Sequence, residues 1–441
     1  MNKKTENKAV SPWQWVPSLY FAQGIPYVVV MSVAVILFKR MGMSNTDIAL
    51  YTSGLNLPWV IKPLWSPLVD LLKTKRWWIV VMQILVGAGL AGIALTIQGP
   101  LAFRYCLAFM WLLAFSSATH DIAADGFYML GLNEKKQAYF VGIRNTFYRF
   151  AVIFGQGILV MFAGWLEQRY AREMPETAAI PQAWSLTFYL LTILFALLFV
   201  SHYLFLPHPR RDTCTLPPQQ ASAGRVFKEF LGTFTSFFQK KHIVSALIFI
   251  LLYRFAEAQL VKITSPFLLD TPATGGLALS TAEVGFIYGT IGVIALTIGG
   301  IVGGIAMARR GLKSCLWTMT IAMNLPNIVY LYLSFARPES IGIISGCVAI
   351  EQFGYGFGFT SLTYFMMLFS NGKHQTAHYA ICTGFMALGL MLPGMISGWI
   401  EESIGYRAFF VWIMLCTIPS FWATHLVRKN LTDNHSDNSS R

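Results

Sequence analysis

Nine ionisable side chains lie inside stretches of this chain that are otherwise long and apolar enough to cross a lipid bilayer. They are Lys62, Asp121, Asp125, Arg144, Arg149, Arg254, Glu257, Lys262 and Glu351. An unpaired charge at membrane depth costs roughly 2.5–3.5 kcal/mol. Nine uncompensated charges would cost on the order of 25 kcal/mol, which exceeds the net stability of a typical fold. We therefore expect them to face one another, or water, inside a helical bundle with an apolar exterior.

The composition agrees with a membrane protein. Of the 441 residues, 55% are hydrophobic and 12% are charged, whereas a soluble domain carries about 25% charged residues. The segment from Met1 to Val10 is polar and basic and has no apolar core followed by a cleavage site, so we expect no signal peptide. No pair of the six cysteines brackets an external loop, which predicts neither a disulfide framework nor a metal site.

Twelve apolar segments are candidate membrane spans, because a crossing needs about 20 apolar residues. They run roughly over residues 17–38, 47–72, 77–97, 101–130, 137–164, 183–206, 241–268, 281–308, 314–335, 340–369, 375–398 and 404–427. The chain is thus predicted to be an all-α membrane protein. Its parts are an N-terminal six-helix half (1–206), a linker (207–240), a C-terminal six-helix half (241–430) and a polar tail (431–441).

The basic residues predict the orientation of the chain in the membrane. The loops on one side carry 21 of the 33 Lys and Arg residues, and the loops on the other side carry seven, Lys39 and Arg40 among them. We expect both termini and the linker to be cytoplasmic. The net charge of +13 is then a topology signal, and no nucleic-acid partner is expected. Within the linker, residues 226–238 are predicted either as an amphipathic helix on the membrane surface or as a solvated segment with incidental aromatic residues.

The depths of the charged residues predict which of them can meet. A helix rises about 1.5 Å per residue, so Asp125 lies roughly 8 Å and Arg144 roughly 10 Å from the cytoplasmic ends of adjacent spans. Asp121 and Arg149 lie deeper, at roughly 14 and 18 Å. We expect the pairs Asp125–Arg144 and Asp121–Arg149, with Lys62 at the same level. This predicts a charged cluster in the cytoplasmic part of the N-terminal half.

A second cluster is predicted near the middle of the bilayer. Glu257 and Glu351 are each about eleven residues from the outer membrane face. Arg254 precedes Glu257 by three residues, so their side chains can touch. The span of Glu351 offers no cation, and burial disfavours the charged form of such a carboxyl group, which is the property that a proton carrier needs. We therefore predict that Glu351 carries a proton.

The nine charges comprise five bases and four acids, which leaves one spare cation that could meet an anionic substrate. The alternative is that these charges form static ion pairs that hold helices together. For Asp125, Arg144 and Lys262, which lie near the membrane edges, the two interpretations stay equally open.

Six plus six spans with a cytoplasmic linker is the layout of major facilitator transporters. Asp70, Lys73, Lys75 and Arg76, in the loop after the second span, resemble the motif of that superfamily in its first cytoplasmic hairpin. The resemblance implies that spans one, four, seven and ten line a central cavity. We expect Asp70, Lys73, Arg76 and Arg144 to act in gating.

Several segments are similar to one branch of the superfamily, the peptide/acetyl-CoA transporter family, which includes AmpG-type muropeptide permeases. The matching runs are Leu19 to Pro26, Lys62 to Asp70, His120 to Gly126, Glu351 to Met367 and Thr376 to Ala380. His120 and His378 stand where the family usually has glutamine, and a histidine there can hydrogen-bond or titrate. The run Asp125-Gly126-Phe127 is closer to the acetyl-CoA branch than to the muropeptide branch.

The resemblance implies proton-driven import of an anionic cell-wall fragment, an N-acetylglucosamine–anhydro-N-acetylmuramic acid sugar with or without peptide. It adds Asp121 and Asp125 to Glu351 as candidates for proton coupling. The candidates for substrate binding are Gln23, Lys62, Arg149, Arg254, Glu257, Gln352 and His378.

We therefore expect a monomeric secondary transporter of muropeptide-like fragments in cell-wall recycling, without cofactor or metal. The nearest alternative is a carrier of another organic anion, such as an acyl-CoA, a siderophore or a drug-like compound. A transport-dead membrane sensor with the same fold is a second alternative. An enzyme is disfavoured, because no loop gathers a nucleophile with a base, and no catalytic residue is expected.

Overall fold

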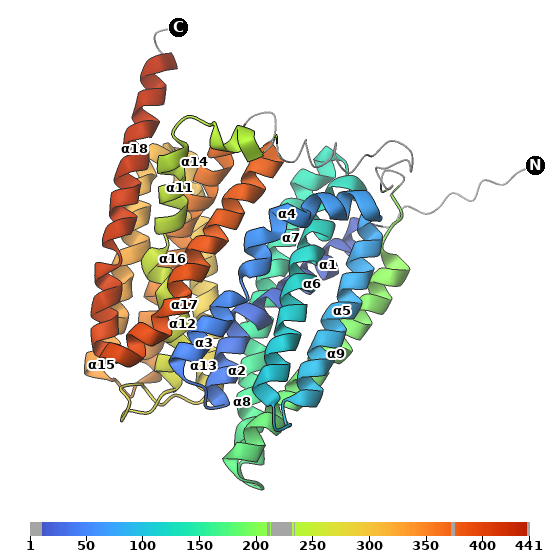
Figure 1. Ribbon diagram of the computed structural model, residues 1–441, viewed down its shortest axis with the longest axis vertical. Helices are drawn as coiled ribbons and strands as arrows, with labels where there is room; N and C mark the ends of the chain where they lie inside the picture. The colour runs from blue at the N-terminus through green and yellow to red at the C-terminus, as the bar shows by residue number, and fades with distance from the viewer. Residues whose placement is uncertain (1–10, 210–211, 213–231, 233, 372–374, 439–441) are drawn as a thin grey trace, which may run out of the picture. The chain divides into compact units, whose positions relative to one another are not determined.

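A computed structural model describes residues 11–209, 212, 232, 234–371 and 375–438 (Figure 1). Within these residues all regular structure is helical. Contacts divide the chain into two compact units. The first unit comprises Met1–Val28, Trp65–Phe154 and Ser185–Ala221, and the second comprises Val29–Leu64, Gly155–Trp184 and Ser222–Arg441. The division into two six-helix halves around residues 207–240 stays a prediction.

The first unit is a bundle built on α1. Its elements are η1 (Pro12–Gln14), α1 (Val16–Val28), α5 (Lys75–Thr96), α6 (Ala102–Gly131), α7 (Glu134–Val152), the end of α4 (Leu57–Leu72) and the later part of α9 (Glu176–Phe205). Helix α1 packs against α6 and α7, and α5 packs against α6. Gly24 lets α1 lie directly on α7, because a Cβ atom at this position would collide with Ala151. Edge-on aromatic pairs, Trp15 with Phe127 and Tyr20 with Tyr128, fill the core beside this contact.

The second unit combines segments from both ends of the sequence. The earlier segments contain η2 (Val29–Val33), α2 (Ala34–Arg40), α3 (Asn45–Gly54), the start of α4, most of η3 (Ile153–Ile158), α8 (Leu159–Tyr170) and the start of α9. The later elements are α11 (Ile243–Leu252), α12 (Phe255–Leu269), α13 (Thr281–Val284), η4 (Gly285–Gly292), α14 (Val293–Asn324), η5 (Leu325–Asn327), α15 (Ile328–Ala336), α16 (Ile341–Phe369), α17 (Gln375–Leu415) and α18 (Ile418–Asn438). Helix α3 packs against α17, and α8 packs against α13.

Helices α14 and α16 meet backbone to backbone in the second unit. A Cβ atom at Gly356 of α16 would collide with the carbonyl oxygen of Leu296. A Cβ atom at Gly299 of α14 would likewise collide with the carbonyl oxygen of Phe353. Small residues at helix contacts are typical of membrane bundles, where close van der Waals packing replaces a hydrophobic driving force.

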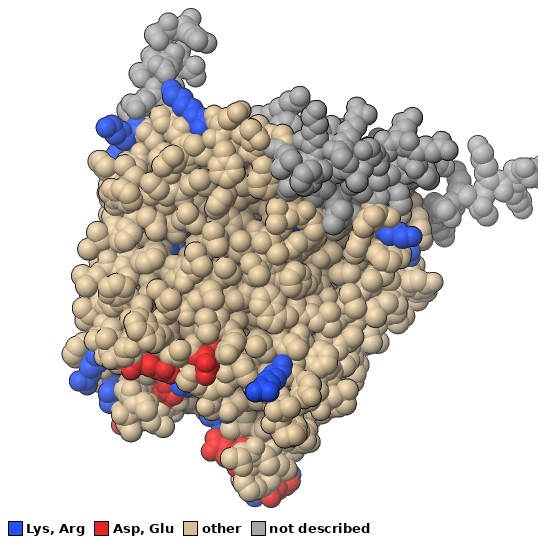
Figure 2. Space-filling view, in the orientation of Figure 1, with Lys and Arg blue, Asp and Glu red and all other residues tan. Residues whose placement is uncertain are grey.

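Eight helical stretches of the described chain are long and apolar enough to cross a membrane. Two of them, Thr281–Ala336 and Ala377–Asn430, have 56 and 54 residues, enough for two crossings each. Each contains a glycine with positive φ, Gly311 at 74° and Gly405 at 77°, where the helix is interrupted. With α16 and the segment from α3 to α4, these stretches account for the twelve predicted spans. Figure 2 shows that most of the surface in view is uncharged, as expected of a surface that meets lipid.

Most of the predicted amphipathic segment, residues 226–238, lies outside the described residues. Its described end is helical from 234 to 238. Phe237 is fully buried there, with its ring against those of Phe369 and Phe385. This described end of the linker therefore packs on the second unit through Phe237, while Thr235 and Phe238 stay exposed; the prediction for the whole segment stays a prediction.

Candidate functional site

The seventh predicted span is broken in its middle. Helix α11 ends at Leu252 and α12 begins at Phe255, and Arg254 between them has non-helical backbone angles of φ −105° and ψ 20°. Both parts lie in one candidate span, Ile243–Leu269. A helix break at membrane depth is tolerated where protein or a water-filled cavity surrounds it. The break thus points to the neighbourhood of Arg254 as a candidate site.

Arg254 is fixed by an acid and two aromatic rings. Its Nε and Nη2 atoms lie 3.0 and 2.9 Å from Oε2 of Glu257, which confirms the predicted contact between these residues. Nη2 also donates to the hydroxyl of Tyr355 at 2.8 Å. The guanidinium lies 5.2 and 5.0 Å from the ring centres of Tyr355 and Phe359. The side chains of Arg254 and Glu257 are only 9% and 8% exposed, so the pair is shielded from water.

Glu351 lies in the same unit, on α16, and is 3% exposed. Its Oε2 atom accepts hydrogen bonds from the hydroxyl of Tyr330 at 3.1 Å and from Nε2 of Gln352 at 2.9 Å. Within the described part of the chain, no Lys or Arg reaches this carboxyl group at ion-pair distance. The carboxyl group is therefore held by neutral donors, as expected for a group that can gain and lose a proton without breaking an ion pair.

Lys262, on α12, is a buried cation for which the sequence left two interpretations open. It is 2% exposed and forms no ion pair with the acids of residues 11–209, 212, 234–371 and 375–438. Glu257, the partner of Arg254, is nevertheless close enough for its charge to act on Lys262, so both interpretations of Lys262 stay predictions. The excess of one base in the sequence was the available signal. Which base carried the excess could not be told, because the pairing was unknown.

The first unit contains a similar group of side chains, which joins α1, α6 and α7. Arg144 lies 3.4 Å from Asp125, which confirms the predicted pair. The hydroxyl of Tyr20 donates to Asp125 at 3.1 Å and accepts from Arg144 at 3.0 Å. The guanidinium also lies over the rings of Tyr20 and Tyr128. Here the side chains of Asp125 and Arg144 are 42% and 27% exposed, so solvent reaches both charges.

The other predicted residues of the N-terminal half, Gln23, Lys62, Asp121 and Arg149, lie on α1, α4, α6 and α7 respectively. Gln23 is buried on α1, and its Oε1 atom has no hydrogen-bond partner among the described residues. Asp121, Arg149 and Lys62 are partly buried. The pair Asp121–Arg149 and the binding roles of these residues stay predictions.

His120, next to Asp121, belongs to a buried polar chain. Gln83 lies 3.2 Å from Nε2 of His120 and 2.8 Å from Nδ1 of His202, whose Nε2 lies 2.9 Å from the hydroxyl of Ser18. The chain links α6, α5, α9 and α1. Of the two possibilities for a histidine at position 120, the structure shows hydrogen bonding. His202 and Gln83 were not selected from the sequence because uncharged polar residues do not stand out in a membrane span.

His378 contacts the described end of the linker. Its Nε2 lies 3.0 Å from the hydroxyl of Ser236, and its ring contacts that of Phe237. A part in substrate binding stays a prediction for this residue.

Three of the four predicted gating residues, Asp70, Lys73 and Arg76, lie in the sequence from the end of α4 to the start of α5. The side chain of Asp70 is outside the described part, and Lys73 is exposed, with its ammonium 6.0 Å from the ring of Trp77. Arg76 is bound to the end of α9 through the carbonyl oxygens of Tyr203 and Leu206. Asp212 of the linker accepts hydrogen bonds from the first two backbone N–H groups of α5, at 2.7 and 3.0 Å. This acid caps the helix and was not predicted.

Three further acids, Glu167, Asp270 and Glu401, take part in contacts that the sequence did not predict. Lys39, at the end of α2, lies 2.7 Å from Asp270, which accepts a hydrogen bond from Tyr406. Asn45 donates to Glu401 at 2.7 Å. These acids lie at the ends of predicted spans or in loops, where a charged residue is common and does not by itself indicate a site.

Glu167 is the most heavily bonded of the missed acids. Its carboxyl group accepts from Nε of Arg40 at 3.1 Å, from Nε1 of Trp184 at 2.8 Å and from the hydroxyl of Thr281 at 2.7 Å. Lys39 and Arg40, adjacent in the sequence, thus bind two acids that lie 103 residues apart (270 − 167). Among the described residues, no group of three His, Cys, Asp or Glu side chains could hold a metal ion.

Comparisons with known proteins agree with this architecture. The sequence model of the Major Facilitator Superfamily matches residues 18–380. The chain is similar to the putative transporter AmpG 4 of Rickettsia conorii, with 25% identity over 92% of this chain and 93% of that protein. It is similar to the anhydromuropeptide permease of Escherichia coli K12, with 24% identity over 94% of this chain and 79% of that protein. A crystal structure of a POT family transporter in complex with a thioalcohol-conjugated peptide matches with a TM-score of 0.72 and 10% identity, over 94% of this chain and 95% of that one, which shows the fold alone.

Proposed function

Because this chain belongs to the Major Facilitator Superfamily, whose members are membrane transporters, we propose that it imports muropeptide-type cell-wall fragments with protons across the bacterial inner membrane. The substrate class is proposed from two relatives, the putative transporter AmpG 4 and the anhydromuropeptide permease, which align with more than nine tenths of this chain. The cytoplasmic location of both termini is proposed from the distribution of the basic residues.

The environment of Glu351 is the observation that carries the proposed proton coupling. The carboxyl group is buried, and its described partners, Tyr330 and Gln352, are neutral. Loss of its proton would leave a charge in the protein interior that no described cation offsets at close range, which is costly. The proton would therefore leave only when a change of conformation brings water or a cation to Glu351. This links proton release to movement of the protein.

Lys262 and the group around Arg254 are proposed to bind the substrate. Lys262 is buried and has no acid at ion-pair distance among the described residues, so an incoming carboxylate would stabilise its ammonium, and anhydromuramic acid carries one. Tyr355 and Phe359, which flank Arg254, offer ring faces that can stack on a sugar. Gln23, Lys62, Arg149, Gln352 and His378 remain proposed contacts. Asp121 and Asp125 remain proposed proton-coupling residues.

Gating is proposed to involve both sets of loops. The pairs Lys39–Asp270 and Arg40–Glu167 would hold the outer ends of the helices that they join. Asp70, Lys73, Arg76 and Arg144 would act at the cytoplasmic ends. Asp212 would fix the start of α5 against the linker during this movement.

The test is uptake of labelled N-acetylglucosamine–anhydro-N-acetylmuramic acid into proteoliposomes, with and without an inward-directed proton gradient. We expect the gradient to accelerate uptake by the natural protein. Glu351→Gln keeps the size of the side chain but cannot carry the proton, so it should lose the gradient-driven part while retaining exchange of labelled for unlabelled sugar. The matched control is Glu339→Gln, which changes an exposed acid and should leave both activities unaltered.

Two outcomes would contradict the proposal in different ways. Equal gradient-driven uptake by the natural protein and Glu351→Gln would remove Glu351 as the proton carrier. Absence of sugar uptake by the natural protein, together with transport of an acyl-CoA or a siderophore under the same conditions, would replace the substrate. Binding of the sugar without any flux would indicate a sensor.

A further inference from the structure

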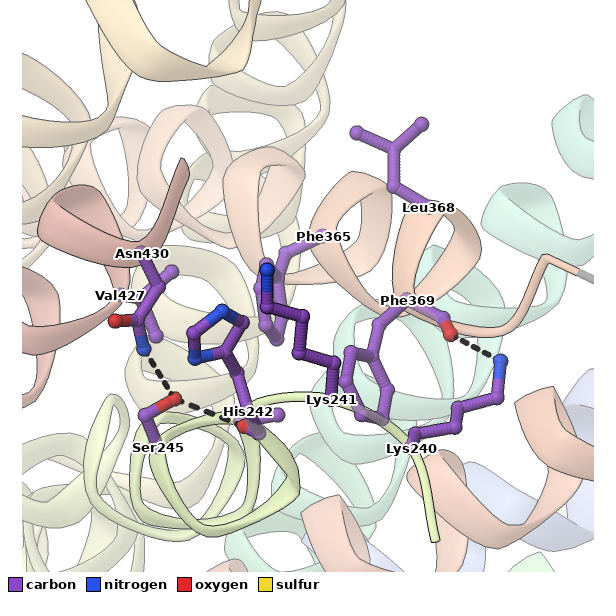
Figure 3. A pocket seen from close by; sticks show the side chains of 10 residues that line it. Lys240, Lys241, His242, Ser245, Phe365, Leu368, Phe369, Val427 and Asn430 are labelled. Atoms are coloured by element: carbon purple, nitrogen blue, oxygen red, sulfur yellow. Dashed lines mark hydrogen bonds between the residues drawn. The ribbon is translucent and has the colours of Figure 1, made fainter. Parts of the chain in front are cut away.

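A cavity of about 320 Å³ lies at the point where α11 begins and α16 ends (Figure 3). The ends of two candidate spans indicate the level of this cavity in the membrane. One candidate span begins at Ile243, directly after three residues that line the cavity, and another ends at Asn430, which lines it as well. The cavity is therefore at the level where these helices leave the hydrocarbon core, which is the level of lipid headgroups.

The cavity is lined by positive charge. Lys240 and Lys241 line it, and none of the described residues around it is an acid. The ammonium of Lys240 is fixed by the carbonyl oxygens of Phe369 and Asn371, at 2.6 and 2.9 Å. Partial burial lowers the pKa of Lys240 from its ordinary value, because water no longer fully solvates the charge. A nearby anion would favour its charged form.

His242 supplies a polar atom that the described chain does not use. Its Nε2 atom is buried and has no hydrogen-bond partner within the described residues. The backbone at His242 has a φ of 62°, in the left-handed region that a non-glycine residue rarely adopts. Ser245 holds this conformation by donating to the carbonyl oxygen of His242 at 2.8 Å, and Asn430 donates to Ser245 at 2.6 Å. Strain that the surroundings maintain in this way is typical of binding sites.

The start of α11 adds a third attraction for an anion. In the part of the chain that the structure describes, no side chain caps its first turn. The N–H groups and the helix dipole at this end favour a negative charge. In Figure 3 the side chains of Lys241 and His242 extend to the same side of the chain at this helix end.

The remaining walls are apolar and reach the surface that meets lipid. Phe365, Leu368 and Val427 line the cavity, and Leu368 is 40% exposed. Val244, in the first turn of α11, is 68% exposed. Apolar walls beside a group of cations do not suit a freely soluble anion, but they suit a molecule with a charged head and acyl chains.

We propose that this cavity binds the phosphate group of an anionic phospholipid. The phosphate would lie between Lys241, His242 and the first turn of α11, and the acyl chains would follow Leu368 and Val244. A free phosphate ion presents the same group to the same atoms, so the two sources share the polar part of the site. The apolar walls and the level of the cavity in the membrane favour the lipid.

The test uses the full-length protein in a neutral detergent, titrated calorimetrically with dihexanoylphosphatidylglycerol, dihexanoylphosphatidylcholine or inorganic phosphate. We expect saturable binding of phosphatidylglycerol and much weaker binding of the other two. Lys241→Gln should weaken phosphatidylglycerol binding about fivefold, which corresponds to about 1 kcal/mol. Lys241 is preferred to Lys240 because Lys240 also holds the end of α16, so its replacement could disturb the fold.

The matched control is the double variant Arg309→Gln, Arg310→Gln. It removes two exposed arginines that follow each other in the sequence and do not line the cavity. Unchanged binding by this variant would support a specific site. An equal loss in the control and in Lys241→Gln would show general attraction between charges and overturn the proposal. Equal binding of inorganic phosphate and phosphatidylglycerol, or of the two lipids, would also overturn it. As a second variant, His242→Phe keeps a ring but removes the nitrogen, and unaltered binding would exclude His242 from the site.

Discussion

The two units contain the same three kinds of side chain in two different settings. The first-unit triad consists of Tyr20, Asp125 and Arg144, and the second-unit triad consists of Arg254, Glu257 and Tyr355. In the first, the carboxylate and guanidinium side chains are 42% and 27% exposed. In the second, the corresponding values are 8% and 9%. The same kinds of contact should therefore contribute more to stability in the buried second-unit triad than in the solvent-exposed first-unit triad.

The hydrogen bonds of the triads also differ. In the first unit, the hydroxyl of Tyr20 lies between acid and base and bonds to both, and the three residues come from three helices. In the second unit, Arg254 bonds directly to Glu257, three residues further along the chain. The second pair is a local contact that stabilises a broken helix. The first is a contact between helices that water or a substrate can interrupt.

The largest expected effect is that of Arg254→Gln. It leaves the carboxylate of Glu257 buried without its ion-pair partner, which should destabilise the protein by about 3–5 kcal/mol. Thermal unfolding of the purified protein in detergent measures the loss. The double variant with Glu257→Gln removes both charges and should recover most of the stability. If the double variant were as unstable as the single one, the unpaired carboxylate of Glu257 would not be the cause of the lost stability.

A smaller effect is expected from removing the tyrosine hydroxyls. Tyr355→Phe removes an acceptor from a buried guanidinium and should cost about 1.5–3 kcal/mol, the range for hydrogen bonds to charged groups. Tyr20→Phe should cost about 1 kcal/mol, because water can reach both of its partners. The same unfolding measurement, made on both variants, compares the units directly. If both variants lost the same amount of stability, solvent exposure would not determine how much each triad contributes.

The smallest effect on stability is expected from Arg144→Gln. An ion pair that solvent reaches contributes roughly 0–1 kcal/mol, and added salt should reduce it further. Uptake of the labelled sugar should nevertheless fall, since the pair joins α6 and α7 where movement is proposed. A large loss of stability without a loss of uptake would contradict this, because the first-unit triad would then stabilise the fold and take no part in transport.

The sequence predicted contacts that depend on helix geometry alone. Arg254 and Glu257 share a helix face, and Asp125 and Arg144 lie at equal depths on consecutive antiparallel spans, so both pairs could be derived from spacing. The role of Lys262 could not be derived, because it depends on which acids the other bases occupy. Glu167 and Asp270 were missed because their partners, Arg40 and Lys39, are remote in sequence and outside the membrane core.

The surroundings of His378 were unpredictable for a different reason. They depend on where the end of the linker folds back. The helical spacing of the aromatic residues in 226–238 predicted an apolar face that includes Phe237, but it did not predict that this face would contact the ring of His378. The break at Arg254 also gave no sequence signal, since neither proline nor glycine occurs there.

The glycine contacts between α14 and α16 limit how the second unit can move. Most packed helices are separated by a layer of side chains, and small rotations of those side chains let one helix slide along the other. At Gly299 and Gly356 this layer is missing, because the two backbones are in contact. A shift of one helix along the other would press Cα hydrogens into carbonyl oxygens. The two helices should therefore move together as one rigid body. Any bending during a change of conformation must then occur elsewhere, at elements such as the helix break beside Arg254.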